Sequence, residues 1–426
     1  MARFAIFITV GGWLAFIVTT VYKALFSGEI SGRFVLDAFL YLTVVSVLTG
    51  SALAYLLGRL GYLYRTREHQ RTPRATLDAF FGTGGPSLTV LVPSYKEEPD
   101  VVRQTLLSAA LQEYPDQRIV LLIDDPPNPS EDADRALLEA ARALPGEIED
   151  LLLGPRRRFG AALAEFEAQA PAGTVTPRQI DSLAGEYEHA QAFLAGLAGE
   201  PDPDDHGAEF LRVEVILQLA ENFGTVARAL RQAAAEEGEI GRQRLHQLYQ
   251  RLAWTFRADL TSFERKRYAS LSREPNKAMN LNSYIGLLGG RYREQRTAQG
   301  PALTPTADDR CDLEVPDSDY VLTLDADSIL LPEYCLRLVY LLEQADYERV
   351  AVMQTPYSSF PGARARRSHG RLRSASRSRG RCGRRAHRRD VCADSGRRPC
   401  HQPVPDLVGQ RGVREVRQGD LAPQRL

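Results

Sequence analysis

Short apolar segments that end directly on acidic side chains restrict the fold of this chain more than any other feature of its sequence. The clearest case is residues 320–327, where Tyr-Val-Leu-Thr-Leu is followed at once by Asp-Ala-Asp. An apolar run without polar alternation predicts a strand that is buried on both faces, as in a parallel sheet. Because ligands of such sheets bind beyond the carboxyl ends of the strands, Asp325 and Asp327 are predicted to lie at a binding edge. Asp-X-Asp alone is typical of a solvated turn, and only the preceding strand makes a binding site an equal alternative.

A strand, a helix and a second strand follow one another earlier in the chain. Residues 88–93 form an apolar run, residues 101–112 have helical spacing, and residues 118–123 form a second apolar run that ends on Asp124 and Asp125. This order, with acids at strand ends, is typical of a βαβ unit in an open, mostly parallel sheet of an α/β fold. The sheet pattern is predicted to resume at residues 276–288, 320–324 and 350–354, with a helix from about Glu333.

Residues 131–274 interrupt this pattern with long polar stretches that are rich in Ala, Glu, Leu, Arg and Gln. Apolar residues recur every three or four positions within residues 213–252, which indicates an amphipathic helix. We therefore predict a helical insertion that packs on itself, and the alternative is a surface that screens the membrane or a partner. Residues 201–205, Pro-Asp-Pro-Asp-Asp, are predicted to be a solvated break between helices rather than a metal site.

Residues 1–60 are predicted to form a transmembrane helical hairpin. Residues 4–22 and 38–58 are free of charged side chains, and each run is close to the roughly 20 residues that a helix needs to cross a membrane. A cleaved signal peptide and a buried hairpin are the alternatives, and the presence of a second long run argues against both. By the positive-inside rule we expect a multi-pass protein of the inner (plasma) membrane with its soluble part in the cytoplasm. The basic residues at the exit of the second run are Arg59, Arg65, Arg67, Arg71 and Arg74.

Composition changes abruptly near residue 362. The chain of 426 residues is 44% hydrophobic with a net charge of −1, which suits one large or two ordinary globular units. Residues 361–426, however, hold 18 Arg, five acids and no Lys. We expect residues 363–426 to be out of frame, and the alternatives are a disordered tail or an arm that binds nucleic acid or anionic lipid. Five Cys without disulfide or zinc spacing favour a reducing compartment.

Two pairs of acidic residues at one edge of the sheet would suit the binding of a nucleotide diphosphate. Asp124 and Asp125 can accept hydrogen bonds from a base or ribose. Asp325 and Asp327 can hold a divalent cation, Mg²⁺ or Mn²⁺, that bridges phosphate oxygens. Lys277 adds a positive charge for the phosphates. The sequence therefore predicts a metal-dependent nucleotide site, and it predicts no specific nucleic-acid partner.

Amide side chains add to the predicted site. Asn280 and Asn282 both donate and accept hydrogen bonds, as sugar or phosphate groups require. Helix capping or turn formation is the alternative for each of them. Only their combination with the strand-end acids favours a binding role.

Five short motifs occur in order: Leu-Val-Pro-Ser-Tyr-Lys-Glu at 91–97, Leu-Ile-Asp-Asp at 122–125, Asn-Lys-Ala-Met-Asn-Leu-Asn at 276–282, Asp-Ala-Asp at 325–327 and Gln-Thr-Pro at 354–356. This ordered set resembles the processive, membrane-bound family 2 glycosyltransferases, the relatives of cellulose, chitin and hyaluronan synthases. The resemblance covers about residues 1–362, apart from the helical insertion. It implies a GT-A fold, a nucleotide-sugar donor, a divalent cation, a glycan or lipid-linked acceptor, and inversion at the anomeric carbon.

The resemblance also implies a division of the chain and a role for individual residues. Residues 86–130 and 275–362 would be the two halves of the GT-A domain. The implied donor-binding residues are Ser94, Glu97, Asp124, Asp125, Lys277, Asn280 and Asp325, the implied metal ligands are Asp325 and Asp327, and Gln354 would lie on the acceptor side.

Two departures from the family pattern limit this expectation. Pro126-Pro127 replaces the usual Gly or Ser, which stiffens the loop and removes backbone donors. A Thr-Glu-Asp motif with the general base, a Gln-X-X-Arg-Trp motif and further membrane helices are expected after residue 356, and none is present. A general base contributes about 10²–10⁴-fold, so we expect an inverting glycosyltransferase, truncated as written, that binds donor and metal with little or no transfer. The alternative is a non-catalytic, membrane-anchored nucleotide-sugar-binding or scaffold protein.

Overall fold

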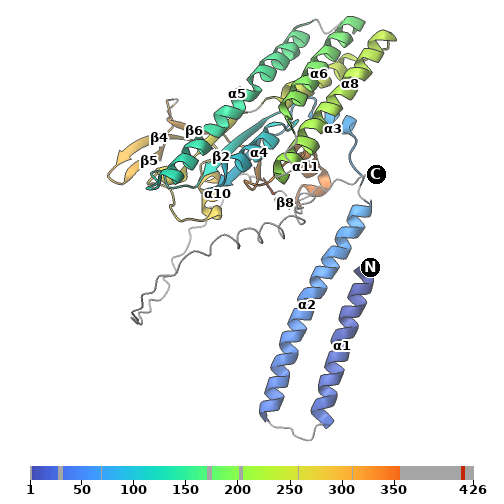
Figure 1. Cartoon of the computed structure of the whole chain (residues 1–426), viewed down its shortest axis with the longest axis vertical. Helices are drawn as coiled ribbons and strands as arrows, with labels where there is room; N and C mark the ends of the chain where they lie inside the picture. The colour runs from blue at the N-terminus through green and yellow to red at the C-terminus, as the bar shows by residue number, and fades with distance from the viewer. Residues whose placement is uncertain are drawn as a thin grey trace, which may run out of the picture. The chain divides into compact units, whose positions relative to one another are not determined.

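The computed structural model describes residues 2–26, 32–68, 70–169, 175–200, 205–257, 259–308, 310–355 and 414–417. The chain divides into two compact units, Met1–Pro73 and Arg74–Leu426, and Figure 1 labels their helices and strands. Residues 201–204 of the predicted break and most of the predicted tail lie outside the described residues, and Asp205 is the N-cap of a short helix.

The first unit is a pair of long helices, α1 (Ala2–Phe26) and α2 (Gly32–Glu68). Their apolar stretches, Arg3–Lys23 and Val35–Tyr64, are 21 and 30 residues long and leave many large apolar side chains exposed. Each stretch is long enough to cross the hydrocarbon core of a membrane, which takes about 20 residues. The two predicted spans are therefore confirmed as candidate membrane-spanning helices.

The second unit is built on a parallel sheet. Its strands are β1 (Leu88–Ser94), β2 (Gln117–Ile123), β3 (Leu260–Phe263), β7 (Tyr320–Thr323), β8 (Val352–Gln354) and β9 (Arg414–Arg417), in the order β3-β2-β1-β7-β9-β8. The strands predicted at β1, β2 and β7 are confirmed, and nearly all of their residues are buried. The chain places β2 on one side of β1 and β7 on the other. The strand order therefore reverses between β1 and β7, and in open α/β sheets such a switch point is where ligands bind.

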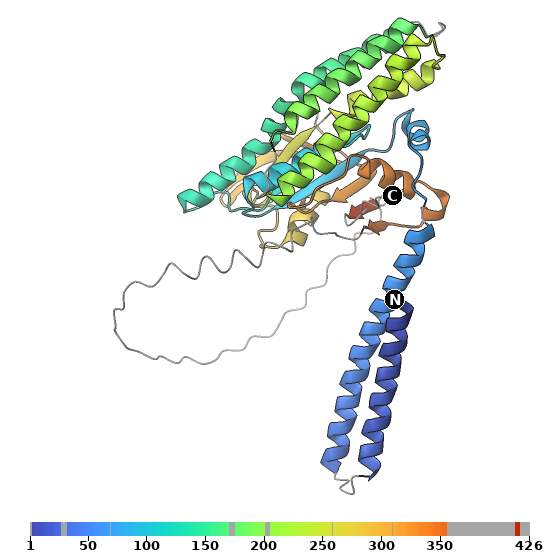
Figure 2. The ribbon, with the colours of Figure 1, turned by 45° about the vertical axis from the view of Figure 1, so that its right-hand side comes forward.

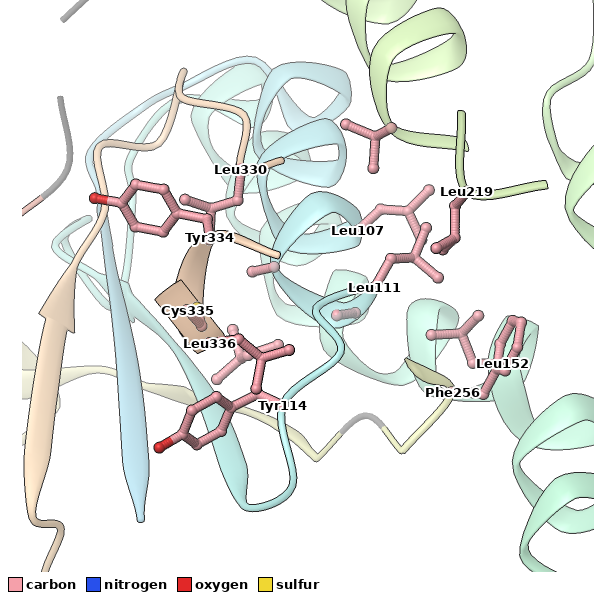
Figure 3. Close-up of a cluster of buried hydrophobic side chains, with 14 of the residues drawn as sticks. Leu107, Leu111, Tyr114, Leu152, Leu219, Phe256, Leu330, Tyr334, Cys335 and Leu336 are labelled. Carbon is pink, nitrogen blue, oxygen red and sulfur yellow. The ribbon is translucent and has the colours of Figure 1, made fainter. Parts of the chain in front are cut away.

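Helix α4 (Pro99–Ala110) packs between the sheet and the helical insertion, as Figure 3 shows in close-up. Leu107 and Leu111 lie on the side toward Leu219 and Phe256 of the insertion, and all four side chains belong to one continuous apolar cluster. The helix predicted here is confirmed. The insertion, in turn, shares a core with the sheet domain in addition to packing on itself.

The insertion between β2 and β3 is mainly helical, as predicted. Its helices are α5 (Asp132–Ala168), α6 (Pro177–Leu197), α7 (His206–Phe210), the π-helical segment η1 (Leu211–Leu217), α8 (Gln218–Ala235) and α9 (Arg242–Thr255). α5, α6 and α8 run side by side as a long bundle (Figures 1 and 2). A buried ion pair ties the insertion to the connection between α4 and β2, because Glu113, 1% exposed, accepts hydrogen bonds from Arg251 of α9 at 2.9 and 3.0 Å.

Two segments differ from the sequence prediction. Residues 276–288 are predicted as part of the sheet but form a helix, α10 (Lys277–Ile285). The Asn276 side chain accepts a hydrogen bond from Met279 N at 2.7 Å and so caps this helix. Conversely, β3 lies inside the stretch predicted as helical. It has four residues, of which only the first and last are buried, and so short a segment gives no usable periodicity.

A second sheet, which the sequence does not predict, lies next in the chain. It is antiparallel and consists of β4 (Gly290–Thr297), β5 (Gly300–Pro305) and β6 (Leu313–Val315), in the order β5-β4-β6. Gly300 has a φ of 119°, which glycine adopts readily and other residues rarely do, so it can start β5 directly after the tight turn. The helix predicted from about Glu333 is present as α11 (Tyr334–Leu342).

Candidate functional site

The carboxyl ends of β1, β2 and β7 bring three of the predicted motifs together. Asp124 N donates to Ser94 O at 2.9 Å, and Leu324 N donates to Leu91 O at 2.9 Å, so the pairing continues to the strand ends. Asp325 follows directly in the chain. The switch point between β1 and β7 is therefore flanked by Ser94, Asp124 and Asp325.

The neighbouring carboxylates Asp124 and Asp125 are both buried but have different partners. Asp124 Oδ1 accepts a hydrogen bond from Arg265 Nε at 2.7 Å, and its Oδ2 lies 3.4 Å from Lys266 Nζ. Asp125 Oδ2 accepts from Lys96 N at 3.3 Å, and burial raises the pKa of this carboxyl above its ordinary value. Asp124 is thus held by two cations within the protein, whereas Asp125 keeps acceptor capacity for a ligand.

The loop after β1 has a constrained backbone next to these carboxylates. Lys96 has a φ of 51°, in the left-handed region that a residue with a Cβ rarely adopts. Such conformations cost about 1–3 kcal/mol and cluster at binding sites. The strained turn directs Lys96 N at Asp125, and it presents the Tyr95 ring, 52% exposed, with Lys266 Nζ 5.3 Å from its centroid. Glu97, a predicted donor-binding residue, is exposed on the same loop.

The Asp-Ala-Asp motif forms a turn directly beyond β7. Ser328 N donates to Asp325 O at 3.0 Å and closes the turn. Asp327 is exposed, and the side chain of Asp325 is 35% exposed. Lys277, the first residue of α10, forms an ion pair with Asp325 Oδ1. The predicted phosphate-binding lysine and the predicted metal ligand are therefore in direct contact.

Three buried polar residues of the α4 segment hold the chain that follows this turn. Thr105 Oγ1 donates to Ala326 O at 2.6 Å, and Ser108 Oγ accepts from Leu330 N at 3.0 Å. Gln112 Nε2 donates to Leu331 O at 2.8 Å, and its Oε1 accepts from Cys335 N at 3.1 Å. None of these residues is among the predicted site residues, although Thr105, Ser108 and Gln112 recur at helical spacing among buried apolar residues.

The remaining predicted residues differ in burial: Asn280 is buried, whereas Asn282 and Gln354 are exposed. Asn280 is 1% exposed; its Nδ2 donates to Leu122 O at 3.0 Å, and its Oδ1 has no hydrogen-bond partner within the described chain. This contact anchors α10 against the end of β2. Asn282 is exposed on α10, and Gln354 is exposed at the end of β8.

The carboxylates at the switch point are too few to hold a divalent cation by themselves. They fit a cation whose other ligands are the phosphate oxygens of a bound nucleotide. Within the described ranges no group of three or more His, Cys, Asp or Glu side chains converges. Mg²⁺ is commonly held by one or two carboxylates together with substrate phosphates. Asp325 and Asp327, both accessible and one residue apart, match that donor set.

A hollow of about 550 Å³ lies elsewhere, near the amino ends of β1 and β2, and contains none of the predicted site residues. Its lining includes Gly84, Asp116, His246 and Trp254. The candidate site is therefore defined by the strand ends and their side chains, not by this hollow. No family model matches the chain, and neither a curated protein nor a solved structure matches it.

Proposed function

We propose that this chain is a membrane-anchored, GT-A-type glycosyltransferase that binds a nucleotide-diphosphate sugar at the carboxyl edge of its parallel sheet. The observation that carries the proposal is that Asp125, beyond β2, and the contacting residues Lys277 and Asp325, beyond β7, lie at the same carboxyl edge of the sheet, on either side of β1. Carboxylates can bind a divalent cation and accept hydrogen bonds from a nucleoside. An ammonium group can bind a diphosphate, and an exposed aromatic ring can contact a base.

Each residue has a distinct role in this proposal. Asp125 accepts from the base or ribose, because Arg265 and Lys266 already hold Asp124. Lys277 contacts the diphosphate, and Asp325 and Asp327 hold Mg²⁺ or Mn²⁺. The bound cation would neutralise charge that develops on the leaving diphosphate. The acceptor, a glycan or a lipid-linked saccharide, would approach from the side of Gln354.

The two candidate membrane-spanning helices of the first unit support a location at the membrane. In the proposal the second unit faces the cytoplasm, where nucleotide sugars are made, and the membrane is the plasma membrane. The reaction would be of the inverting type, in which the acceptor oxygen attacks the anomeric carbon as the nucleotide diphosphate leaves.

Metal-dependent nucleotide binding tests the proposal. The full chain in detergent, titrated with a panel of UDP- and GDP-sugars in the presence of Mn²⁺ by calorimetry, should bind one of them. Asp325→Ala and Asp327→Ala should each weaken that binding by on the order of tenfold or more, because each removes a charged contact to the metal complex. Asp346→Ala, at an exposed carboxylate of η3 (Ala345–Tyr347), is the matched control and should leave the affinity unchanged.

Two results would contradict the proposal. One is the absence of any nucleotide-sugar binding by a folded chain. The other is binding that is equally strong with and without divalent cation and in the Asp325→Ala variant. Radiolabelled sugar transfer by the same preparation separates an active transferase from a protein that only binds its donor.

A further inference from the structure

We infer that Arg265, a residue with no contact to the proposed ligands, positions both halves of the donor site. The side chain is 0% exposed and is one of the largest fully buried side chains among the residues that the structure describes. It belongs to a single 3₁₀ turn, η2 (Arg265–Arg267), between β3 and α10. That these contacts shape a donor site rests on the proposed function. The contacts of Arg265 themselves do not depend on it.

The guanidinium group of Arg265 donates to three acceptors in two segments of the chain. Its Nε donates to Asp124 Oδ1 at 2.7 Å, at the end of β2. Its Nη1 donates to Ser272 O at 2.5 Å, and its Nη2 donates to Glu274 O. These two carbonyls belong to the loop that leads to Asn276, the N-cap of α10.

The contacts of Arg265 therefore connect the nucleoside end of the site to its phosphate end. On one side it fixes Asp124 and, through the chain, the adjacent Asp125. On the other side it fixes the loop that sets where α10 begins, and Lys277 is the first residue of that helix. Since Lys277 forms the ion pair with Asp325, a shift of this loop would move the proposed phosphate contact.

Only arginine can make this set of contacts. Its guanidinium is planar and presents five N–H donors in fixed directions, whereas the ammonium of lysine is a compact charge on a flexible stem. A buried ion pair is weak support for stability, since apolar residues of equal volume often serve as well. Three acceptors around a single buried guanidinium are better explained by a need to fix the positions of the two segments that carry them.

The test is Arg265→Lys in the full chain in detergent. We expect hydrogen exchange of residues 272–282 to speed up by at least tenfold, because lysine keeps the charge opposite Asp124 but cannot also reach both carbonyls. Exchange in β1 and β2 should stay as in the unsubstituted chain. Affinity for UDP or GDP with Mn²⁺, whichever the unsubstituted chain binds, should fall by about tenfold, as expected for one misplaced charged contact.

Arg267→Lys is the matched control, because Arg267 is exposed in the same turn and should change neither measurement. Unchanged exchange at residues 272–282 in Arg265→Lys would overturn the inference, and so would a loss of protection spread evenly over β1 and β2. If the unsubstituted chain binds neither nucleotide, the proposed function fails, while the exchange result still decides whether Arg265 holds the loop.

Discussion

At the scale of single residues, Asp124 and Asp125 are neighbours in the chain, but within the described residues only Asp124 is paired with cationic side chains, whereas Asp125 is the one that we propose binds the ligand. Asp124 is neutralised by Arg265 and Lys266, so its charge is compensated inside the fold. Asp125 is as deeply buried, but its described hydrogen bond comes from the neutral N–H of Lys96. An ionised carboxylate in that position is destabilising until a ligand supplies donors.

The pH dependence of stability should reflect this difference. Burial raises the pKa of Asp125 in the folded chain, so the folded state holds this proton more tightly than the unfolded chain. The stability from the neutral carboxyl is complete below the unfolded pKa of about 3.9 and is lost as pH rises through the raised folded value. Asp125→Asn should therefore stabilise the fold at pH 7, within the range of about 0.5–3 kcal/mol that single substitutions produce.

Urea unfolding of the full chain at pH 7 and pH 4 checks this expectation. The gain in unfolding free energy of Asp125→Asn over the unsubstituted chain should be present at pH 7 and should shrink toward pH 4. The variant should bind nucleotide more weakly than the unsubstituted chain. Asp116→Asn, at an exposed carboxylate at the start of β2, is the control for a general effect of charge. An advantage of equal size at both pH values would show that ionisation of Asp125 is not its cause.

At the scale of secondary structure, α4 supports the Asp-Ala-Asp turn through its buried polar side. Thr105→Val keeps the shape of the side chain but removes the donor to Ala326 O, a hydrogen bond of 2.6 Å. Leaving a buried carbonyl without a partner costs about 1–3 kcal/mol. We expect Thr105→Val to lose that much unfolding free energy in urea and to bind the metal–nucleotide complex more weakly, since the turn that carries Asp325 and Asp327 is released.

Thr105→Ser is the control for this prediction, because it retains the hydroxyl group and removes only a methyl group. It should keep most of the affinity for nucleotide. If Thr105→Val keeps its affinity while Thr105→Ser loses it, packing of the methyl group rather than the hydrogen bond supports the turn.

The sequence predicts correctly those elements whose apolar pattern alone determines whether they form a strand or a helix. β1, β2 and β7 are apolar along nearly their whole length, and the spacing of α4 is helical, so local pattern and burial agree. The sheet prediction over residues 276–288 is wrong for α10, because the start of this helix depends on the cap at Asn276 and not on an apolar pattern. β3 becomes a strand only by pairing with β2. The positions of Asp325 and Lys277 beside each other depend on tertiary contacts, which a single segment does not encode.

At the scale of the whole molecule, a short strand far along the chain, β9, joins the sheet of the second unit. β9 lies between β7 and β8, with Tyr320 opposite Arg414 and Gln354 opposite Arg417. These four residues are the part of the predicted out-of-frame tail that the structure describes. The hypothesis that the tail is out of frame stays a prediction, and this pairing allows a test of whether these four residues belong to the folded sheet.

A chain that ends at residue 362 lacks β9, and β8 has its described pairing with β9 alone. Hydrogen exchange should therefore show that the backbone amides of β8 lose their protection in the shortened chain, while those of β1 and β2 keep it. Nucleotide binding should persist, because the proposed donor site lies on β1, β2, β7 and α10. If the amides of β8 exchange equally fast in both chains, β9 is no part of the folded sheet.

The contact between Lys277 and Asp325 has a consequence for the competition among small ions in a cell. In the proposed site, a divalent cation alone has to displace Lys277 from Asp325, and inorganic phosphate alone has to displace Asp325 from Lys277. A chelate of cation and diphosphate offers both residues a partner of opposite charge in a single event. In the proposed function, this ion pair would thereby favour the intact complex over its separate components.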